Sequence, residues 1–173
     1  MQSLHTCRLA LEPYAPAQRV EFLDWMAEDS VEAFLSRSFP GSPRGSALFE
    51  AFTTLRADAN HRHLAWAVKE LASGRLVGHV ECKATAKVLD GQLELIYAVR
   101  HELRSNGFAT ESTTQVSGTL AAAGIEVVAF INPKNVASRR VLQKSKFRLL
   151  SPTSNSSAEQ WLHPVAQAPD SDA

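Results

Sequence analysis

A strand, a short loop containing glycine and a helix follow one another between residues 92 and 124, and this succession restricts the fold more than any other feature of the sequence. Residues 92–99 (QLELIYAV) have the β-branched and aromatic content of a strand. Asn106-Gly107 alone is typical of a hairpin turn, but apolar and small side chains follow it at four-residue spacing and the run ends at Gly124, as a helix does. The loop therefore leads into a helix start, where free backbone N–H groups and the helix dipole favour the binding of phosphate.

Strand and helix patterns alternate along the rest of the chain, which predicts an α/β fold. Residues 1–163 are expected to form a single domain, and residues 164–173 a disordered tail. The other expected elements are a strand at 7–14, one or two helices within 15–37, a helix at 47–57, a hairpin of strands at 63–70 and 75–84, a strand at 125–131, a helix at 135–145, a strand from Phe147 and a short strand around Trp161.

The composition favours a soluble, cytoplasmic protein. The 173 residues include 18 basic and 18 acidic side chains, so no net charge points to a nucleic-acid or membrane partner. The sequence shows no apolar leader and no run of 18 apolar residues. Cys7 and Cys82 lack the spacing of a zinc site or disulfide framework and are expected to be buried small apolar residues. His61 and His63 have no third ligand nearby, so no metal site is expected.

Two motifs lie between residues 104 and 147. Arg104-x-x-Gly107-x-Ala109 resembles the acyl-CoA signature [QR]-x-x-G-x-[GA] of the GNAT superfamily of N-acetyltransferases, and Glu111 follows as in the run G-[FY]-A-T-E of its RimJ/RimL branch. The second motif resembles N-x-x-N-x-x-S-x-x-[VL]-x-x-K-x-G-F of the same branch. Its matching residues are Asn132, Asn135, Ser138, Val141, Lys144 and Phe147.

The resemblance implies a GNAT fold with a mixed, twisted sheet of about 6–7 strands and helices on both faces. Acetyl-CoA would bind between two splayed strands, the one around Glu94 and the one after Ile125. The implied activity is direct acetyl transfer to a primary amine, either a protein N-terminus or a small molecule, by a monomer or homodimer. A non-catalytic acyl-CoA-binding module is the alternative, while a dinucleotide-binding domain is disfavoured because G-x-G-x-x-G is absent.

The same resemblance assigns the residues that would bind the cofactor. Backbone N–H groups from Asn106 to Thr110 would bind the pyrophosphate, because Gly107 lets it approach closely. The edge of the strand at residues 97–99, often beside a bulge, would bind the pantetheine arm. The complete expected set is Tyr97, Ala98, Val99, Arg104, Ser105, Asn106, Gly107, Phe108, Ala109, Thr110, Asn132, Asn135, Ser138 and Arg140.

Glu94 and Ser138 are the candidate catalytic residues. Glu94 matches in position the glutamate that some family members use as general base, although a strand-end carboxylate can also be solvated or paired with a cation. Glu81 and His79 are rivals for that role. The tyrosine that many members use to protonate the leaving thiolate falls at Leu142, so Ser138 remains the candidate acid, with helix capping as its alternative role. A backbone N–H near Val99 would meet the oxyanion.

Four further expectations concern the surroundings of these motifs. Ser105-Asn106 replaces the usual Gly-Lys, which predicts a lower affinity for the cofactor. Lys146 replaces the usual glycine, so the helix at 135–145 is expected to end differently. Arg139 and Arg140 are expected on a solvated helix face, from which one could reach the 3′-phosphate of CoA. Phe34 is expected in the core with the apolar residues of the first helices, or covering the acceptor pocket.

Overall fold

Eight strands form one mixed sheet in the computed structural model, which describes residues 2–27, 29–55, 62–150 and 158–165. The strand order is β1-β2-β3-β4-β5-β6-β8-β7, and of the strand pairs only β5 and β6 run parallel. In chain order the elements are β1 (Leu4–His5), β2 (Leu9–Pro13), η1 (Pro16–Gln18), α1 (Arg19–Met26), α2 (Asp29–Ser36), α3 (Gly45–Thr54), β3 (His63–Glu70), β4 (Leu76–Lys83), β5 (Gln92–Val99), η3 (His101–Leu103), α4 (Phe108–Ala122), β6 (Glu126–Ile131), α5 (Val136–Lys144), β7 (Arg148–Leu149) and β8 (Glu159–His163).

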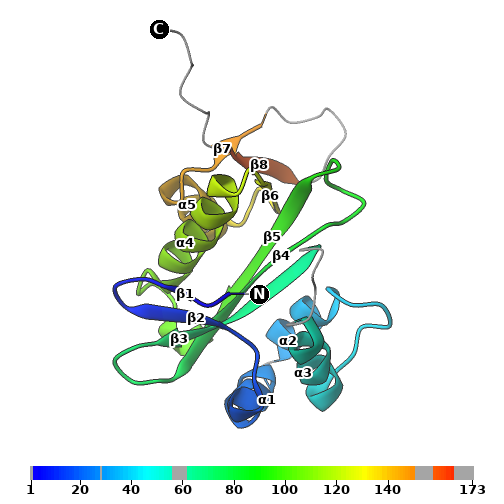
Figure 1. Cartoon of the computed structure of the whole chain (residues 1–173), viewed down its shortest axis with the longest axis vertical. Helices are drawn as coiled ribbons and strands as arrows, with labels where there is room; N and C mark the ends of the chain where they lie inside the picture. Colours follow the sequence, from blue (N-terminus) through cyan, green and yellow to red (C-terminus); the bar gives the residue numbers. More distant parts are fainter. Residues whose placement is uncertain (1, 28, 56–61, 151–157, 166–173) are drawn as a thin grey trace, which may run out of the picture.

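The sheet has helices on both faces, as expected, and is wider than the expected 6–7 strands because β1 and β7 are short edge strands of two residues each. In Figure 1, α4 and α5 lie on one side of the sheet and α1, α2 and α3 on the other. Residues 166–173 of the expected tail lie outside the described residues.

Strand alternation gives each face its own hydrophobic core. In β3, Leu64, Trp66 and Val68 pack with residues of α4 and α5, whereas Ala65 and Ala67 pack with the aromatic residues of α1 and α3. Small alanines on the second face leave room for that aromatic cluster. The predicted hairpin of β3 and β4 is confirmed, with a register shift between Val68 and Lys69.

Two side chains differ from their expected burial. Phe34 is 42% exposed and lies outside the core, whereas the adjacent Leu35 of α2 is buried in the aromatic cluster, because successive helical residues point in different directions. Cys7 is exposed in the turn between β1 and β2, so the expectation of burial is wrong for it. Cys82 is buried as expected, and burial raises the pKa of its thiol. Within the described ranges, no helix combines the length and apolar character needed to cross a bilayer.

Candidate active site

The central feature of the site is the separation of β5 from β6. Their pairing runs from Gln92 with Glu126 to Glu94 with Val128, although β5 continues to Val99 and β6 to Ile131. Beyond Glu94 each strand stays paired with its outer neighbour, β5 with β4 and β6 with β8. The register between β4 and β5 has no shift, so the bulge expected beside residues 97–99 is absent there. β5 and β6 instead separate because β5 remains hydrogen-bonded to β4 while β6 remains hydrogen-bonded to β8.

A cleft of about 640 Å³ opens at this separation. Five of the predicted site residues line it: Glu94, Tyr97, Asn132, Asn135 and Ser138. Phe34, expected either in the core or over the acceptor pocket, also lines it, together with polar side chains that the sequence did not single out: Arg37, Ser38, Lys83, Thr85 and Lys87. These side chains come from the end of α2 and the turn after it, and from the end of β4 and the loop after it. The sequence alone does not indicate that these segments lie beside the separated ends of β5 and β6.

Glu94 lies where β5 and β6 part, on the sheet face of α1–α3. This side follows from alternation, since Leu93 and Leu95 belong to the core under α4 and Ile96 packs against the opposite core. The hydroxyl of Thr85 donates to Glu94 Oε2 at 2.8 Å, and Lys87 Nζ lies 3.7 Å from Oε1. The Glu94 side chain is 10% exposed, so it is a sheltered carboxylate with access to the cleft.

The start of α5 forms the opposite wall, and its asparagines have clear structural roles. Asn132 Oδ1 accepts from the backbone N–H of Lys134 at 2.9 Å, which shapes the turn before the helix. Asn135 is the N-cap, since its Oδ1 accepts from the Ser138 N–H at 3.0 Å. Capping is therefore the role of Asn135, and within the described chain the Ser138 hydroxyl takes part in no hydrogen bond.

The Tyr97 side chain reaches this wall from β5. Its hydroxyl donates to the carbonyl oxygen of Ser138 at 3.5 Å, and burial raises the pKa of the phenol. The sequence reasoning considered only the backbone of Tyr97. Alternation from the apolar Leu93 and Leu95 could have placed its ring on the α4 and α5 face.

The predicted phosphate loop lies beyond the end of β5 and has the backbone form that anion binding needs. Gly107 is the N-cap of α4 with φ of 83°, and Ser105 has φ of 65°, so serine adopts the left-handed form in place of the usual glycine. The first helical bond is donated by Glu111 to the Gly107 carbonyl at 3.0 Å. The N–H groups of residues 108–110 therefore have no acceptor within the helix.

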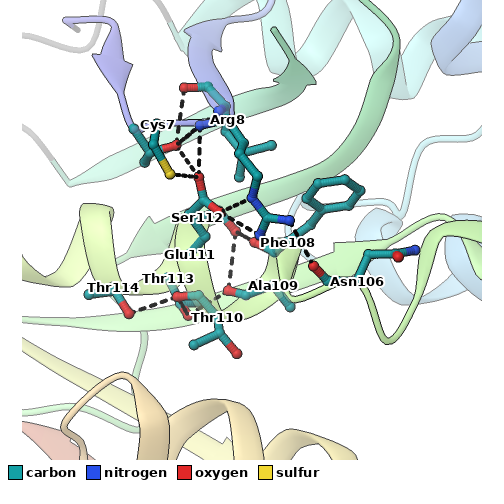
Figure 2. A network of polar contacts seen from close by, with 12 residues as sticks. Cys7, Arg8, Asn106, Phe108, Ala109, Thr110, Glu111, Ser112, Thr113 and Thr114 are labelled. Atoms are coloured by element: carbon teal, nitrogen blue, oxygen red, sulfur yellow. Dashed lines mark hydrogen bonds and ion pairs between the residues drawn. The ribbon is translucent and has the colours of Figure 1, made fainter. Parts of the chain in front are cut away.

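Arg8, from the turn between β1 and β2, holds this loop in place (Figure 2). Its guanidinium donates to Glu111 Oε2 at 2.7 Å and to the Asn106 carbonyl at 3.1 Å, and lies 5.0 Å from the centre of the Phe108 ring. Although burial raises it, hydrogen bonds from Thr6 and Arg8 hold the pKa of Glu111 below its usual value. Sequence reasoning missed Arg8, because 98 residues separate it from Asn106.

Of three other arginines near the site, two are hydrogen-bonded within the described protein and one is not. Arg104 Nε donates to the Val99 carbonyl at 3.3 Å, so this signature residue is folded against the end of β5. Arg139 is paired with Glu159 through two hydrogen bonds. Arg140 is exposed and has no such partner among the described residues, so of the two arginines it remains the candidate for a phosphate contact.

The end of α5 contradicts one expectation. Lys146 has φ of 65° and the Phe147 N–H donates to the Leu142 carbonyl at 3.0 Å. This is the left-handed closure that glycine usually provides, so a different helix end is not seen. Lysine tolerates the conformation because Ser145 and Phe147 on either side are buried and fix the chain there.

The rival bases belong to a buried polar cluster next to the cleft. Glu81 accepts hydrogen bonds from Ser38 and from His63 Nε2, the latter at 2.9 Å, and the Tyr14 hydroxyl lies 2.8 Å from His79 Nδ1. Burial raises the pKa of Glu81, but His63 and His79 outweigh it and lower the pKa to about 2. Glu81 and His79 are fully buried and neither lines the cleft, whereas Ser38, whose hydroxyl donates to Glu81, does line it.

Of the two histidines considered as metal ligands, only His63 lies within the described ranges. No cluster of three or more His, Cys, Asp or Glu residues arranged to hold a metal ion occurs there, His63 is engaged with Glu81, and His61 lies outside the described residues.

Comparison with known proteins gives a consistent result. A family model described as "Acetyltransferase (GNAT) domain" matches residues 8–148. RimL, a ribosomal L7/L12 α-N-protein acetyltransferase solved with coenzyme A, has 12% identity and a TM-score of 0.74 over 95% of this chain and 98% of its own. RimJ of Mycobacterium smegmatis, solved with CoA-disulfide, has 17% identity and a TM-score of 0.65 over 93% of this chain and 84% of its own. The microcin C7 self-immunity acetyltransferase MccE, solved with acetyl-CoA and AMP, has 13% identity and a TM-score of 0.65 over 91% of this chain and 91% of its own. At such identities the structural likeness shows the fold alone. No curated protein is a significant match.

Proposed function

The chain belongs to the GNAT acetyltransferase family, and on that premise we propose that it is an acetyl-CoA-dependent N-acetyltransferase whose acceptor is a primary amine. The observation that carries the proposal is the cleft of about 640 Å³ between β5 and β6. The sheltered carboxylate of Glu94 lines one wall of this cleft, and the start of α5 lines the other. The proposal includes a single domain over residues 1–163 and a cytoplasmic location, with which the unpaired Cys7 and Cys82 are compatible.

The residues present fit acetyl-CoA as co-substrate. The N–H groups at residues 108–110 and the left-handed Gly107 would bind the pyrophosphate, and the edge of β5 at residues 97–99, free of β6, would bind the pantetheine arm. Arg104 and Arg140 are the cations proposed to support the phosphates. Acetyl-CoA supplies the acetyl group as a reactive thioester.

The catalytic roles divide between the two walls of the cleft. Glu94 is the one carboxylate among the described residues lining the cleft, so we assign it the proton that the acceptor amine must lose. Ser138 presents a hydroxyl free of other hydrogen bonds on the opposite wall, where it would donate to the departing sulfur. The buried phenol of Tyr97 is a second hydroxyl on that wall. A backbone N–H near Val99 would stabilise the developing charge on the carbonyl oxygen.

A non-catalytic acyl-CoA-binding module remains the second candidate function. The observation in its favour is Leu142, a buried leucine where many family members have the tyrosine that protonates the thiolate. The two functions share cofactor binding and differ in turnover.

Cofactor binding is tested by Gly107→Asp, with Gly107→Asn as the matched control. Both side chains have the same size, and asparagine tolerates positive φ, so the pair differs mainly by one negative charge at the start of α4, where a Cβ atom would lie 3.4 Å from Arg8 Nη2. In calorimetric titration with acetyl-CoA we expect Gly107→Asp to lose binding and Gly107→Asn to retain it. A dissociation constant for Gly107→Asp within about threefold of the parent value would contradict the assignment.

A further inference from the structure

The cleft wall on the α1–α3 side carries more positive charge than the chain as a whole. The cleft is lined by three cations, Arg37 directly after α2, Lys83 at the end of β4 and Lys87 in the loop that follows, and by the single carboxylate of Glu94. The complete sequence is balanced at 18 basic and 18 acidic residues. This local excess of cations is therefore a property of the cleft.

Two of these cations are not used within the described protein. Lys87 is the one that has partners: its ammonium forms an ion pair with Glu94, 3.7 Å from Oε1, and lies 5.7 Å from the centre of the Phe130 ring. Arg37 and Lys83 form no ion pair with any described residue. Lys83 is the register partner of Glu94, and alternation from the core residue Cys82 places both on the same face of the sheet.

The phosphates of CoA do not account for Arg37 and Lys83. The phosphate loop begins beyond Val99, and the five residue-to-residue steps of extended strand from Glu94 to Val99 span about 16 Å. The loop also has its own proposed cations in Arg104 and Arg140. The unpaired charges therefore face the region from which the acceptor must approach Glu94.

We infer that the acceptor amine carries a carboxylate or phosphate within a few bonds of its nitrogen, and that Arg37 and Lys83 bind this anionic group while Glu94 receives the amine. The spacing follows from the register, because the Cβ atoms of directly opposed residues lie about 4.5–5.5 Å apart. The inference rests on the proposed function and adds the chemical class of the acceptor. The anion can belong to a free small molecule or to an acidic first residue of a peptide.

The test measures initial rates of thiol release by the full chain at saturating acetyl-CoA, with matched pairs of acceptors. The peptide arm compares amidated tripeptides beginning with Asp or Asn, and the small-molecule arm compares phosphoethanolamine with ethanolamine and β-alanine with β-alaninamide. Rates are corrected for the neutral fraction of each amine. In at least one arm we expect kcat/KM to be about 10-fold or more higher for the anionic member, and that arm identifies the source of the anion.

The variants Arg37→Gln and Lys83→Gln should each reduce the ratio between anionic and neutral acceptor toward one. Because the ratio is taken within each variant, a change in folded fraction cancels. Arg148→Gln removes an exposed cation of β7 outside the cleft and should keep the parent ratio.

Each other outcome contradicts the inference in a recognisable way. Transfer to amines with no preference for the anionic member overturns the inference and leaves the acetyltransferase function standing. A preference that survives both glutamine variants overturns the assignment to Arg37 and Lys83. Binding of acetyl-CoA with no transfer to any acceptor overturns the proposed function, and the inference with it.

Discussion

Glu94 shows how one residue of the site derives its character from its position. It is the last residue of β5 paired with β6, so its carboxylate lies where the sheet opens and stays only 10% exposed. Thr85 and Lys87 hold the carboxylate in place without removing it from the cleft. A carboxylate held in this way can accept a proton from an incoming amine, directly or through water.

Replacing Glu94 with glutamine keeps the shape of the side chain and removes its ability to take a proton. We expect kcat/KM near neutral pH to fall by roughly 10²-fold. The pH profile of the parent should rise through a limb set by an enzyme group, whereas the variant should follow only the amine, with a pKa of about 8 for an α-amine or about 10.4 for a lysine.

Glu50→Gln, on the exposed side of α3, is the matched control and should keep both rate and profile. If Glu94→Gln itself keeps the parent kcat/KM and pH profile, Glu94 is a structural carboxylate. Glu81, which is hydrogen-bonded to Ser38 in the cleft wall, would then be the next candidate for the general base.

At the scale of elements, the site depends on how closely β4 holds β5 after β6 has separated. Gly78 of β4 lies opposite Val99, and a Cβ atom at Gly78 would lie 2.6 Å from the carbonyl oxygen of Ala98. The absence of a side chain therefore lets the two strands approach at the end of β5 that borders the phosphate loop.

Gly78→Ala should force β4 and β5 apart at this point. We expect the free energy of unfolding to fall by about 1–3 kcal/mol, as in other overpacked sites, and the affinity for acetyl-CoA to fall because the edge of β5 moves. Gly118→Ala in α4 is the control, since nothing lies within 4 Å of its Cβ and helix propensity favours alanine by about 1 kcal/mol. Urea unfolding and calorimetric titration measure both quantities, and unchanged stability of Gly78→Ala would contradict the packing argument.

Local patterns predicted most of these elements, and long-range contacts account for what they missed. The corner at Gly107 and the helix after Asn135 were predictable because capping, spacing and glycine act over a few residues. The splay of β5 from β6 could not be predicted in its actual form, since it depends on pairing with β4 and β8. The support of the phosphate loop by Arg8 likewise depends on a contact between distant parts of the chain.

At the scale of the whole molecule, the buried polar cluster under α2 and α3 couples the fold to pH. The folded protein keeps the pKa of Glu81 at about 2, below the usual value of 4.5, through His63 and His79. A lowered pKa means that the carboxylate contributes stability above about pH 4.5 and that this contribution is lost as the pH falls toward about 2.

Urea unfolding at a series of acidic pH values should show this loss. The shift corresponds to roughly 3 kcal/mol of unfolding free energy. Glu111 and Glu159 have lowered pKa values and add slopes of the same sign, so the informative quantity is the difference between the parent and Glu81→Gln. The variant should be less stable near neutral pH and should have a flatter profile below about pH 4.5. Parallel profiles would show that Glu81 titrates in the folded protein as it does when unfolded.

The central claim is that the chain transfers an acetyl group from acetyl-CoA to a primary amine. Its most direct test measures thiol release from acetyl-CoA by the full chain over a panel of primary amines and determines the mass of each acceptor by mass spectrometry. An acetyltransferase with its site between β5 and β6 should release one thiol for each amine that gains the mass of one acetyl group, and Gly107→Asp should abolish both signals. Binding of acetyl-CoA without acetylation of any amine in the panel would contradict the account and identify the chain as a binding module of the same fold.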